Sequence, residues 1–214
     1  MQLEPAMLDA VRQYFAALTR DITLVLATGD HAKRDELKTF LAQIVATAPR
    51  LSLTEAADPA LTSPVSFKIL ADGADTGIIF SGIPGGHEFS SLILAILQAG
   101  GSALKLDDSI QTLIRAVRQP LAFTTYVSLS CHNCPDVVQT LNQFALLNPS
   151  ISSEMIDGGL FQEDIAAKNI QGVPAVYLNG EPFANGKIDT ARLVEKLLER
   201  YPELASAAAP AEAL

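Results

Sequence analysis

Two cysteines are the side chains in this sequence best suited to covalent chemistry. Cys131 and Cys134 are the only cysteines among the 214 residues, and they stand two residues apart in the stretch CHNCP. Both lie where a β-rich run, LAFTTYVSLS, passes into the helical pattern CPDVVQTLNQFALL. A C-x-x-C pair at such a strand-to-helix junction indicates a redox-active dithiol. We therefore expect the two sulfurs to form a reversible disulfide.

The expected helix start would make the two thiols unequal. The free N–H groups of a first helical turn, together with the aligned peptide dipoles, favour negative charge. We expect Cys131 to be the exposed and more acidic nucleophile, and Cys134, within the first turn, to resolve mixed disulfides. Pro135 is compatible with this position because its missing N–H would have no helical acceptor so early. His132 either stabilises the thiolate or is simply exposed.

A zinc site and a pair of inert core cysteines are the competing interpretations of the same motif. A structural zinc site needs about four ligands, and the chain has no further cysteine. His31 and His87 are distant in sequence, and we expect His132 to point away from a shared tetrahedron. The sequence therefore predicts no metal in this chain.

A proline at a strand start accompanies the cysteines. Val173 and Pro174 open the strand pattern VPAVYLNG, about 40 residues after Cys134. A proline there cannot donate to a β-ladder, so it marks an edge, a first residue or a cis bond. With the C-x-x-C motif upstream, we expect a cis-proline beside the disulfide.

The order of predicted elements occurs twice. Helix, strand, helix, strand, optional helix, two strands and helix follow one another, and the series repeats at an offset of about 100 residues. We expect an α/β protein of two contiguous folds, each with its own mixed central sheet flanked by helices, sharing one rigid interface; one continuous sheet would contradict this. The predicted division is residues 1–101, without cysteines, residues 102–202, with the C-x-x-C pair, and residues 203–214, a tail or linker.

Composition excludes several classes of function. Apolar residues make up 49% and charged residues 18%, which is typical of a globular protein. A net charge of −9 without a Lys/Arg cluster argues against nucleic-acid binding. No apolar run approaches the roughly 18 residues of a membrane helix, and the acidic N-terminus does not resemble a secretory signal. We expect a cytoplasmic protein with no membrane partner.

Four stretches together resemble a known family: GHEFSSLILAIL, CHNCPDVVQTLNQFALLNP, IDGGLFQEDI and GVPAVYLNG. They look like the N-terminal domain of the F subunit of alkyl hydroperoxide reductase, and the match runs across nearly the whole chain. The resemblance implies two fused thioredoxin-like folds, of which only the second keeps its cysteines. It also implies a dithiol domain that relays electrons from a flavoprotein module using NADH and FAD to a peroxiredoxin that reduces alkyl hydroperoxides.

Carried over to this sequence, the resemblance assigns roles to individual residues. Cys131 and Cys134 would be the redox centre, Pro174 the cis-proline that follows Val173, and Glu88, from the fold without cysteines, a carboxylate near the sulfurs that assists proton transfer. The sequence alone favours another interpretation, in which Glu88 is a solvated acid at a helix start, where the dipole favours negative charge.

The chain departs from the family in length. It has no G-x-G-x-x-G motif and no room for flavin and nicotinamide domains. FAD and NADH would therefore bind to the parent flavoprotein, with this chain either a fragment tethered through its C-terminal tail or a stand-alone relative. Two alternatives remain: a glutaredoxin-like protein disulfide oxidoreductase, although such proteins commonly carry a cysteine pair in each half, and a non-enzymatic adaptor of tandem thioredoxin folds.

Overall fold

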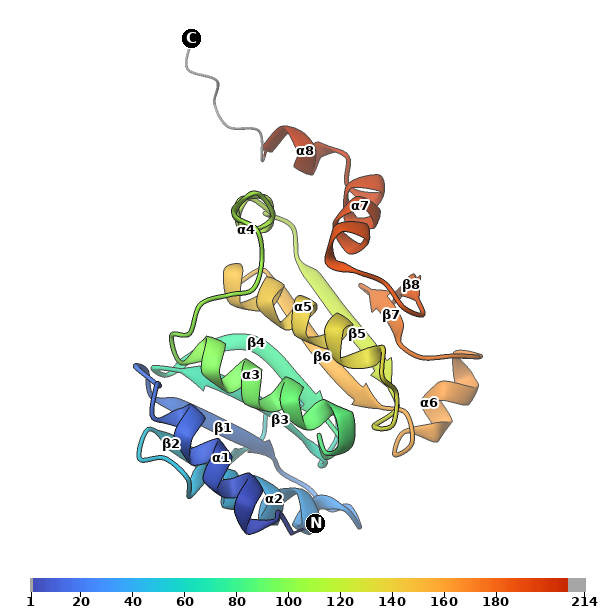
Figure 1. Ribbon diagram of the computed structural model, residues 1–214. Coiled ribbons are helices and arrows are strands. Elements are labelled where there is room, and N and C mark those ends of the chain that lie inside the picture. The colour runs from blue at the N-terminus through green and yellow to red at the C-terminus, as the bar shows by residue number, and fades with distance from the viewer. Residues whose placement is uncertain (1, 208–214) are drawn as a thin grey trace.

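The computed structural model describes residues 2–207. These residues form eight strands flanked by helices. Figure 1 shows the first half of the chain at one end and the second half at the other. The first half contains α1 (Pro5–Phe15), β1 (Ile22–Ala27), α2 (Arg34–Val45), β2 (Leu51–Ala56), β3 (Ser66–Ala71), β4 (Ala74–Ser81), the 3-10 helix η1 (Gly86–Glu88) and α3 (Phe89–Ala99). The second half contains α4 (Asp108–Arg115), β5 (Leu121–Val127), α5 (Cys134–Leu147), β6 (Ile151–Asp157), α6 (Gln162–Ala167), β7 (Ala175–Leu178), β8 (Glu181–Asn185), α7 (Thr190–Arg200) and α8 (Glu203–Ala207).

The two halves repeat one strand topology. In the first half β1 pairs in parallel with β2 and antiparallel with β3, and β4 completes a hairpin with β3. In the second half β5 pairs in parallel with β6 and antiparallel with β7, and β8 completes a hairpin with β7. The expected pair of thioredoxin-like folds, each with a mixed set of strands, is confirmed.

The expectation of a separate sheet for each fold is wrong. All eight strands form one sheet in the order β2-β1-β3-β4-β6-β5-β7-β8. The joint is a parallel pairing of β4 with β6, in register from Ile78 opposite Ser153 to Ser81 opposite Ile156. Separate sheets would leave β4 and β6 as edge strands with unpaired backbone groups, and their pairing removes both edges.

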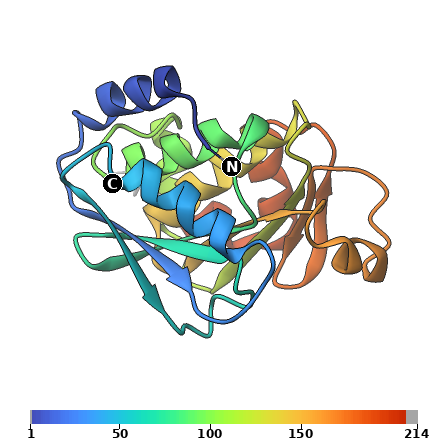
Figure 2. The same cartoon turned by 90° about the horizontal axis from the view of Figure 1, so that it is seen from below.

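Helix α5 covers the joint between the two folds. It contacts β4 from the first fold and β5 and β6 from the second, and it lies beside α3. Figure 2 shows α2, α3 and α5 on the same side of the sheet. One apolar cluster contains fully buried phenylalanines from both halves, among them Phe67, Phe80, Phe123 and Phe144. The folds therefore share a core as well as a sheet.

The opposite face of the sheet is covered near one end by α6. Tyr126 of β5 and Ile156 of β6 alternate with residues of the main core, so they point to the other face, where they pack against Ile165 of α6. Helices thus lie on both faces, although most lie on the face of α5. Within residues 2–207, none of the helices combines the length and the apolar character that a membrane span requires.

The C-terminal region differs in part from the predicted tail. Helix α7 begins after Asp189, whose carboxylate accepts a hydrogen bond from the N–H of Arg192 at 2.8 Å, so Asp189 is the N-cap. Residues 203–207 then form α8, and Leu204 is buried in the main core. A linker beginning at residue 203 is therefore wrong for these residues, because Leu204 has apolar surface to cover. Residues 208–214 of that prediction lie outside the described residues.

Candidate redox site

Cys131 and Cys134 form a disulfide, with their Cα atoms 5.6 Å apart. Helix α5 begins at Cys134 rather than at Cys131, so the first cysteine lies in the preceding turn, where its N–H donates to the carbonyl oxygen of Ser128 at 3.0 Å. Pro135 occupies the first turn of the helix, as predicted. Cys134 is fully buried, whereas Cys131 is half-buried. Of the two sulfurs, Cys131 is thus the more accessible to another molecule.

The peptide bond between Val173 and Pro174 is cis, which confirms that prediction. The carbonyl oxygen of Val173 lies 3.9 Å from Sγ of Cys131, so the cis-proline segment borders the more accessible sulfur. Pro174 is buried, and its own carbonyl oxygen accepts a hydrogen bond from Gly186 at 2.8 Å. The fold therefore brings these two motifs together, about 40 residues apart in sequence, as expected.

The fold without cysteines reaches the loop that carries Cys131. The backbone N–H of His87 donates to the carbonyl oxygen of Leu129 at 2.8 Å. Gly86 has a φ of +55°, and a Cβ atom at this position would lie 2.5 Å from the same carbonyl oxygen. The imidazoles of His87 and His132 lie side by side, with ring centroids 4.2 Å apart. Sequence reasoning named both histidines but did not bring them together.

Glu88 is buried at the interface between η1 and the following helix. Its side chain has no exposed surface, so the interpretation as a solvated helix-start acid is wrong. Oε1 accepts a hydrogen bond from the Ser91 hydroxyl at 2.7 Å, and Gln139 of α5 donates to that hydroxyl at 3.1 Å. Among the described residues, Oε2 has no hydrogen-bond partner. Burial raises the pKa of Glu88 to about 7, against the opposing effect of the Ser91 hydrogen bond.

Two further acids, both half-buried, were not found by sequence reasoning. Burial raises the pKa of Glu154 on β6, and the hydroxyl of Ser81 on β4 donates to its carboxylate at 2.5 Å across the joint. Burial likewise raises the pKa of Asp157 at the end of β6, where the N–H of Gly158 donates to Val127, the last residue of β5. Both acids stand in the strand pattern SISSEMID, which is the only signal the sequence gives for them. The pattern does not indicate which side chains they contact.

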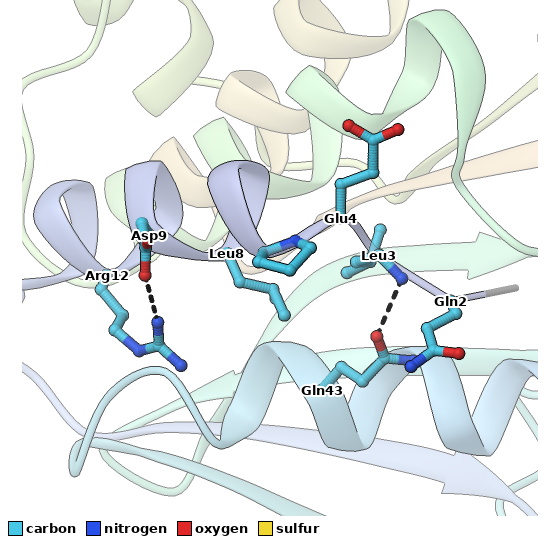
Figure 3. Close-up of a pocket in the computed structure, with 8 residues that line it drawn as sticks. Gln2, Leu3, Glu4, Leu8, Asp9, Arg12 and Gln43 are labelled. Atoms are coloured by element: carbon cyan, nitrogen blue, oxygen red, sulfur yellow. Dashed lines mark hydrogen bonds and ion pairs between the residues drawn. The ribbon is translucent and has the colours of Figure 1, made fainter.

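One surface hollow lies away from the predicted site residues, and another is lined by residues next to two of them in sequence. A hollow of about 520 Å³ lies between the start of α1 and α2, and none of the predicted site residues lines it. The N–H of Leu3 donates to Gln43 at 2.9 Å at this hollow, as Figure 3 shows with a dashed line. A groove of about 580 Å³ is lined in part by Tyr14, Phe89 and Pro135. Of its lining residues, Phe89 directly follows Glu88 in sequence and Pro135 directly follows Cys134. Residues 2–207 contain no cluster of three or more His, Cys, Asp or Glu side chains suited to a metal ion.

Known proteins resemble this chain in its sequence and in its fold. A family model described as a thioredoxin domain matches residues 123–199, the part that contains the disulfide. The F subunit of alkyl hydroperoxide reductase from Staphylococcus aureus (strain NCTC 8325) is 42% identical over 187 residues, which are 87% of this chain and 36% of that protein. A protein named NADH dehydrogenase, from Ferdinandcohnia aciditolerans, is 38% identical over 197 residues, or 92% and 37% of the two chains.

Among solved structures, the NTD_N/C domain of alkylhydroperoxide reductase AhpF from Enterococcus faecalis matches with a TM-score of 0.82 and 32% identity. The match covers 92% of this chain and all of that one. This chain therefore corresponds to a complete domain of that structure, whereas it spans little more than a third of the length of the curated relatives.

Proposed function

Because the chain belongs to the family of N-terminal domains of the alkyl hydroperoxide reductase F subunit, we propose that it is a dithiol/disulfide relay for electrons. The observation that carries this proposal is the Cys131–Cys134 disulfide, of which Cys134 is fully buried and Cys131 is not. Such a pair exchanges with partner thiols through Cys131 and completes each exchange internally through Cys134.

Reduction of the pair takes two exchange steps. A thiolate of the donor attacks Sγ of Cys131, the bond between the two cysteines breaks, and the sulfur of Cys134 leaves with the electron pair and takes up a proton. A second donor thiolate attacks the mixed disulfide, so the donor becomes a disulfide and Cys131 leaves as a thiolate. Two electrons enter the chain in this way.

Delivery of the electrons reverses these steps. The Cys131 thiolate attacks the acceptor's disulfide and forms a mixed disulfide, and one acceptor sulfur leaves. Cys134 then loses its proton and attacks Cys131, which releases the reduced acceptor and restores the disulfide. Glu88 is the proposed group that gives the proton to Cys134 and takes it back, since a carboxyl with a pKa of about 7 can do both near neutrality. Val173 and Pro174 are the proposed support beside Cys131.

The proposed electron donor is a flavoprotein module that binds FAD and NADH and carries its own disulfide. Support comes from the curated relatives, whose names refer to alkyl hydroperoxide reductase and to NADH dehydrogenase and of which this chain spans 36–37%. The proposed acceptor is a peroxiredoxin that reduces alkyl hydroperoxides. We propose that the donor module is tethered through the C-terminal tail and that the reaction takes place in the cytoplasm.

Division of labour between the two folds follows from the position of the cysteines. We propose that residues 102–202 carry the exchange chemistry and that residues 1–101 support it, chiefly through η1. In this proposal the first fold supplies Glu88 and the contacts to the loop before Cys131, while the second supplies both sulfurs and the cis-proline.

Reconstitution tests the proposal. The chain is combined with the flavoprotein portion of a relative such as the Staphylococcus aureus protein and with a two-cysteine peroxiredoxin, and NADH consumption is followed after addition of an alkyl hydroperoxide. We expect consumption that needs all components and that stops when Cys131 or Cys134 is replaced by Ser. Catalysis of disulfide formation in a reduced substrate protein, without transfer to the peroxiredoxin, would favour the protein disulfide oxidoreductase. Full activity of the double Cys→Ser chain would favour the adaptor.

A further inference from the structure

Two histidines from different folds meet beside the disulfide. His87 belongs to η1 and His132 lies between the two cysteines, and their ring planes are tilted by 57° at a centroid distance of 4.2 Å. Both side chains are exposed. The third histidine, His31, lies elsewhere in the first fold, where its Nδ1 accepts a hydrogen bond from the N–H of Lys33 at 3.0 Å. Contact between the other two therefore results from the packing of η1 against the cysteine loop.

The backbone fixes this contact. The N–H of His87 donates to the carbonyl oxygen of Leu129, and Gly86 allows the two chains to approach without a Cβ atom between them. Between them, this hydrogen bond and the ring contact attach the segment 129–132 to the first fold at both of its ends. Because consecutive Cα atoms are about 3.8 Å apart, the imidazole of His132 is held within about 10 Å of the Cys131 sulfur, a range over which charges interact at physiological salt.

We propose that His87 is a positioning residue for dithiol exchange: it holds His132 beside Cys131, and the imidazole pair stabilises the Cys131 thiolate when the disulfide opens. This inference rests on the proposed relay function and deepens it, because it assigns the cysteine-free fold a direct part in the reactivity of the other fold. Exchange requires Cys131 to leave as a thiolate, and positive charge on either of the two adjacent imidazoles lies next to it.

Neighbouring charges do not cancel this effect. From η1 the only acid is Glu88, which is fully buried, and burial raises its pKa to about 7, so it is mostly neutral in mildly acidic solution. The acid in the first turn of α5 is Asp136, which is exposed to solvent. Among residues 128–133, His132 is the one titratable side chain besides Cys131, and residues 171–174 carry no charged side chain.

The test measures the thiolate of Cys131 in the full chain. In a Cys134→Ser background, the rate of alkylation by iodoacetamide is followed from pH 4 to pH 9. His87→Phe keeps a ring against His132 but removes the second imidazole, and His132→Phe removes the nearer one. We expect either substitution to lower the rate at pH 6 by about two- to fivefold, the effect of one partly exposed charge pair, and to move the profile to higher pH. The double variant should lose little more than either single variant, because the pair acts as a unit.

His31→Phe is the matched control and should leave the profile unchanged. An unchanged profile for His87→Phe, with a normal melting temperature, would overturn the inference, and so would strictly additive losses in the double variant. If His87→Phe does not fold, His87→Gln is measured in its place with the same expected shift. A Cys131 thiol that does not exchange with any disulfide in the unmodified chain would instead overturn the proposed relay function, which is a different result.

Discussion

Ser81 of β4 donates a hydrogen bond to Glu154 of β6 at 2.5 Å, and this contact links the two folds across the joint in the sheet. Ser81 is 2% exposed and Glu154 is half-buried, so the hydroxyl replaces part of the water that the carboxyl loses on folding. The bond also opposes the effect of burial, which raises the pKa of Glu154.

Ser81→Ala should therefore destabilise the chain by about 1–3 kcal/mol, the usual cost of leaving a buried acceptor without its partner. Without the hydroxyl, the pKa of Glu154 rises further. The loss of unfolding free energy should therefore be larger at pH 8, where the carboxyl is charged, than at pH 4. Urea denaturation at both pH values measures it. Ser52→Ala is the control, because Ser52 makes a comparable but exposed hydroxyl contact with Thr23 at 3.1 Å between β1 and β2. Equal losses of unfolding free energy in the two variants would show that the contact across the joint stabilises the chain no more than an exposed contact does.

Glu88 should make the chain less stable as pH rises. Its folded pKa, about 7, lies above the unfolded value of about 4.5, so its contribution is fully present below pH 4.5 and is lost as pH rises through 7. The shift corresponds to about 3 kcal/mol for this fully buried group. Glu88→Gln should remove this dependence, and the difference in unfolding free energy between variant and unmodified chain should change by that amount between pH 4 and pH 8. A constant difference over this range would contradict the buried titration.

Glu88→Gln should also slow thiol–disulfide exchange. If Glu88 protonates the Cys134 sulfur as it leaves, the rate constant for reduction of the disulfide, expressed per thiolate of a small dithiol, should fall in the unmodified chain as pH rises through about 7. We expect the substitution to abolish this step and to lower the rate by about 10²–10⁴-fold, the contribution typical of a positioned acid or base. Removing a carboxylate should also favour thiolate formation nearby. An unchanged rate profile would leave the first fold without a part in proton transfer.

The two thiols of the reduced chain should differ in reactivity. Cys134 is fully buried and Cys131 is half-buried at the loop surface, so iodoacetamide should modify Cys131 first. Peptide mapping after brief alkylation at several pH values measures both sites, and we expect reaction at Cys131 well below pH 8.5, the usual pKa of a free cysteine. Modification of Cys134 first, or of neither below that pH, would reverse the proposed assignment.

Gly86→Ala should be costly for a steric reason. The new Cβ atom would lie 2.5 Å from the Leu129 carbonyl oxygen, which belongs to backbone and cannot rotate away. Gly73→Ala is the matched control, since Gly73 also has a positive φ, +80°, but no atom of the described residues lies within 4 Å of the place its Cβ would take. We expect Gly73→Ala to cost about 1 kcal/mol for the left-handed backbone alone and Gly86→Ala clearly more. Thermal unfolding compares the stability of the two variants. Equal losses of stability would show that the loop carrying Leu129 moves away from the new Cβ atom at little cost.

Local patterns predicted the second fold and its redox site well. The C-x-x-C motif, the cis-proline and the repeated order of elements all depend on short stretches whose spacing constrains their conformation. The joint between β4 and β6 could not be predicted in the same way, because alternation along a strand shows which residues face the core but not which edges meet. The contact between His87 and His132 and the burial of Glu88 both depend on that joint. The start of α5 at Cys134 was predicted, because the helical pattern CPDVVQTLNQFALL begins there.

The joint in the sheet also sets an order of events during synthesis. Ile78 and its partner Ser153 are separated by about 75 residues. At the usual rate of about 5–20 residues per second, β4 leaves the ribosome about 4–15 seconds before β6 can pair with it. During that interval the cysteine-free fold has an open edge at β4, because the strand that pairs with it has yet to be made. The first fold must therefore persist as a partly completed template until the redox fold arrives, which makes it the scaffold on which the second fold assembles.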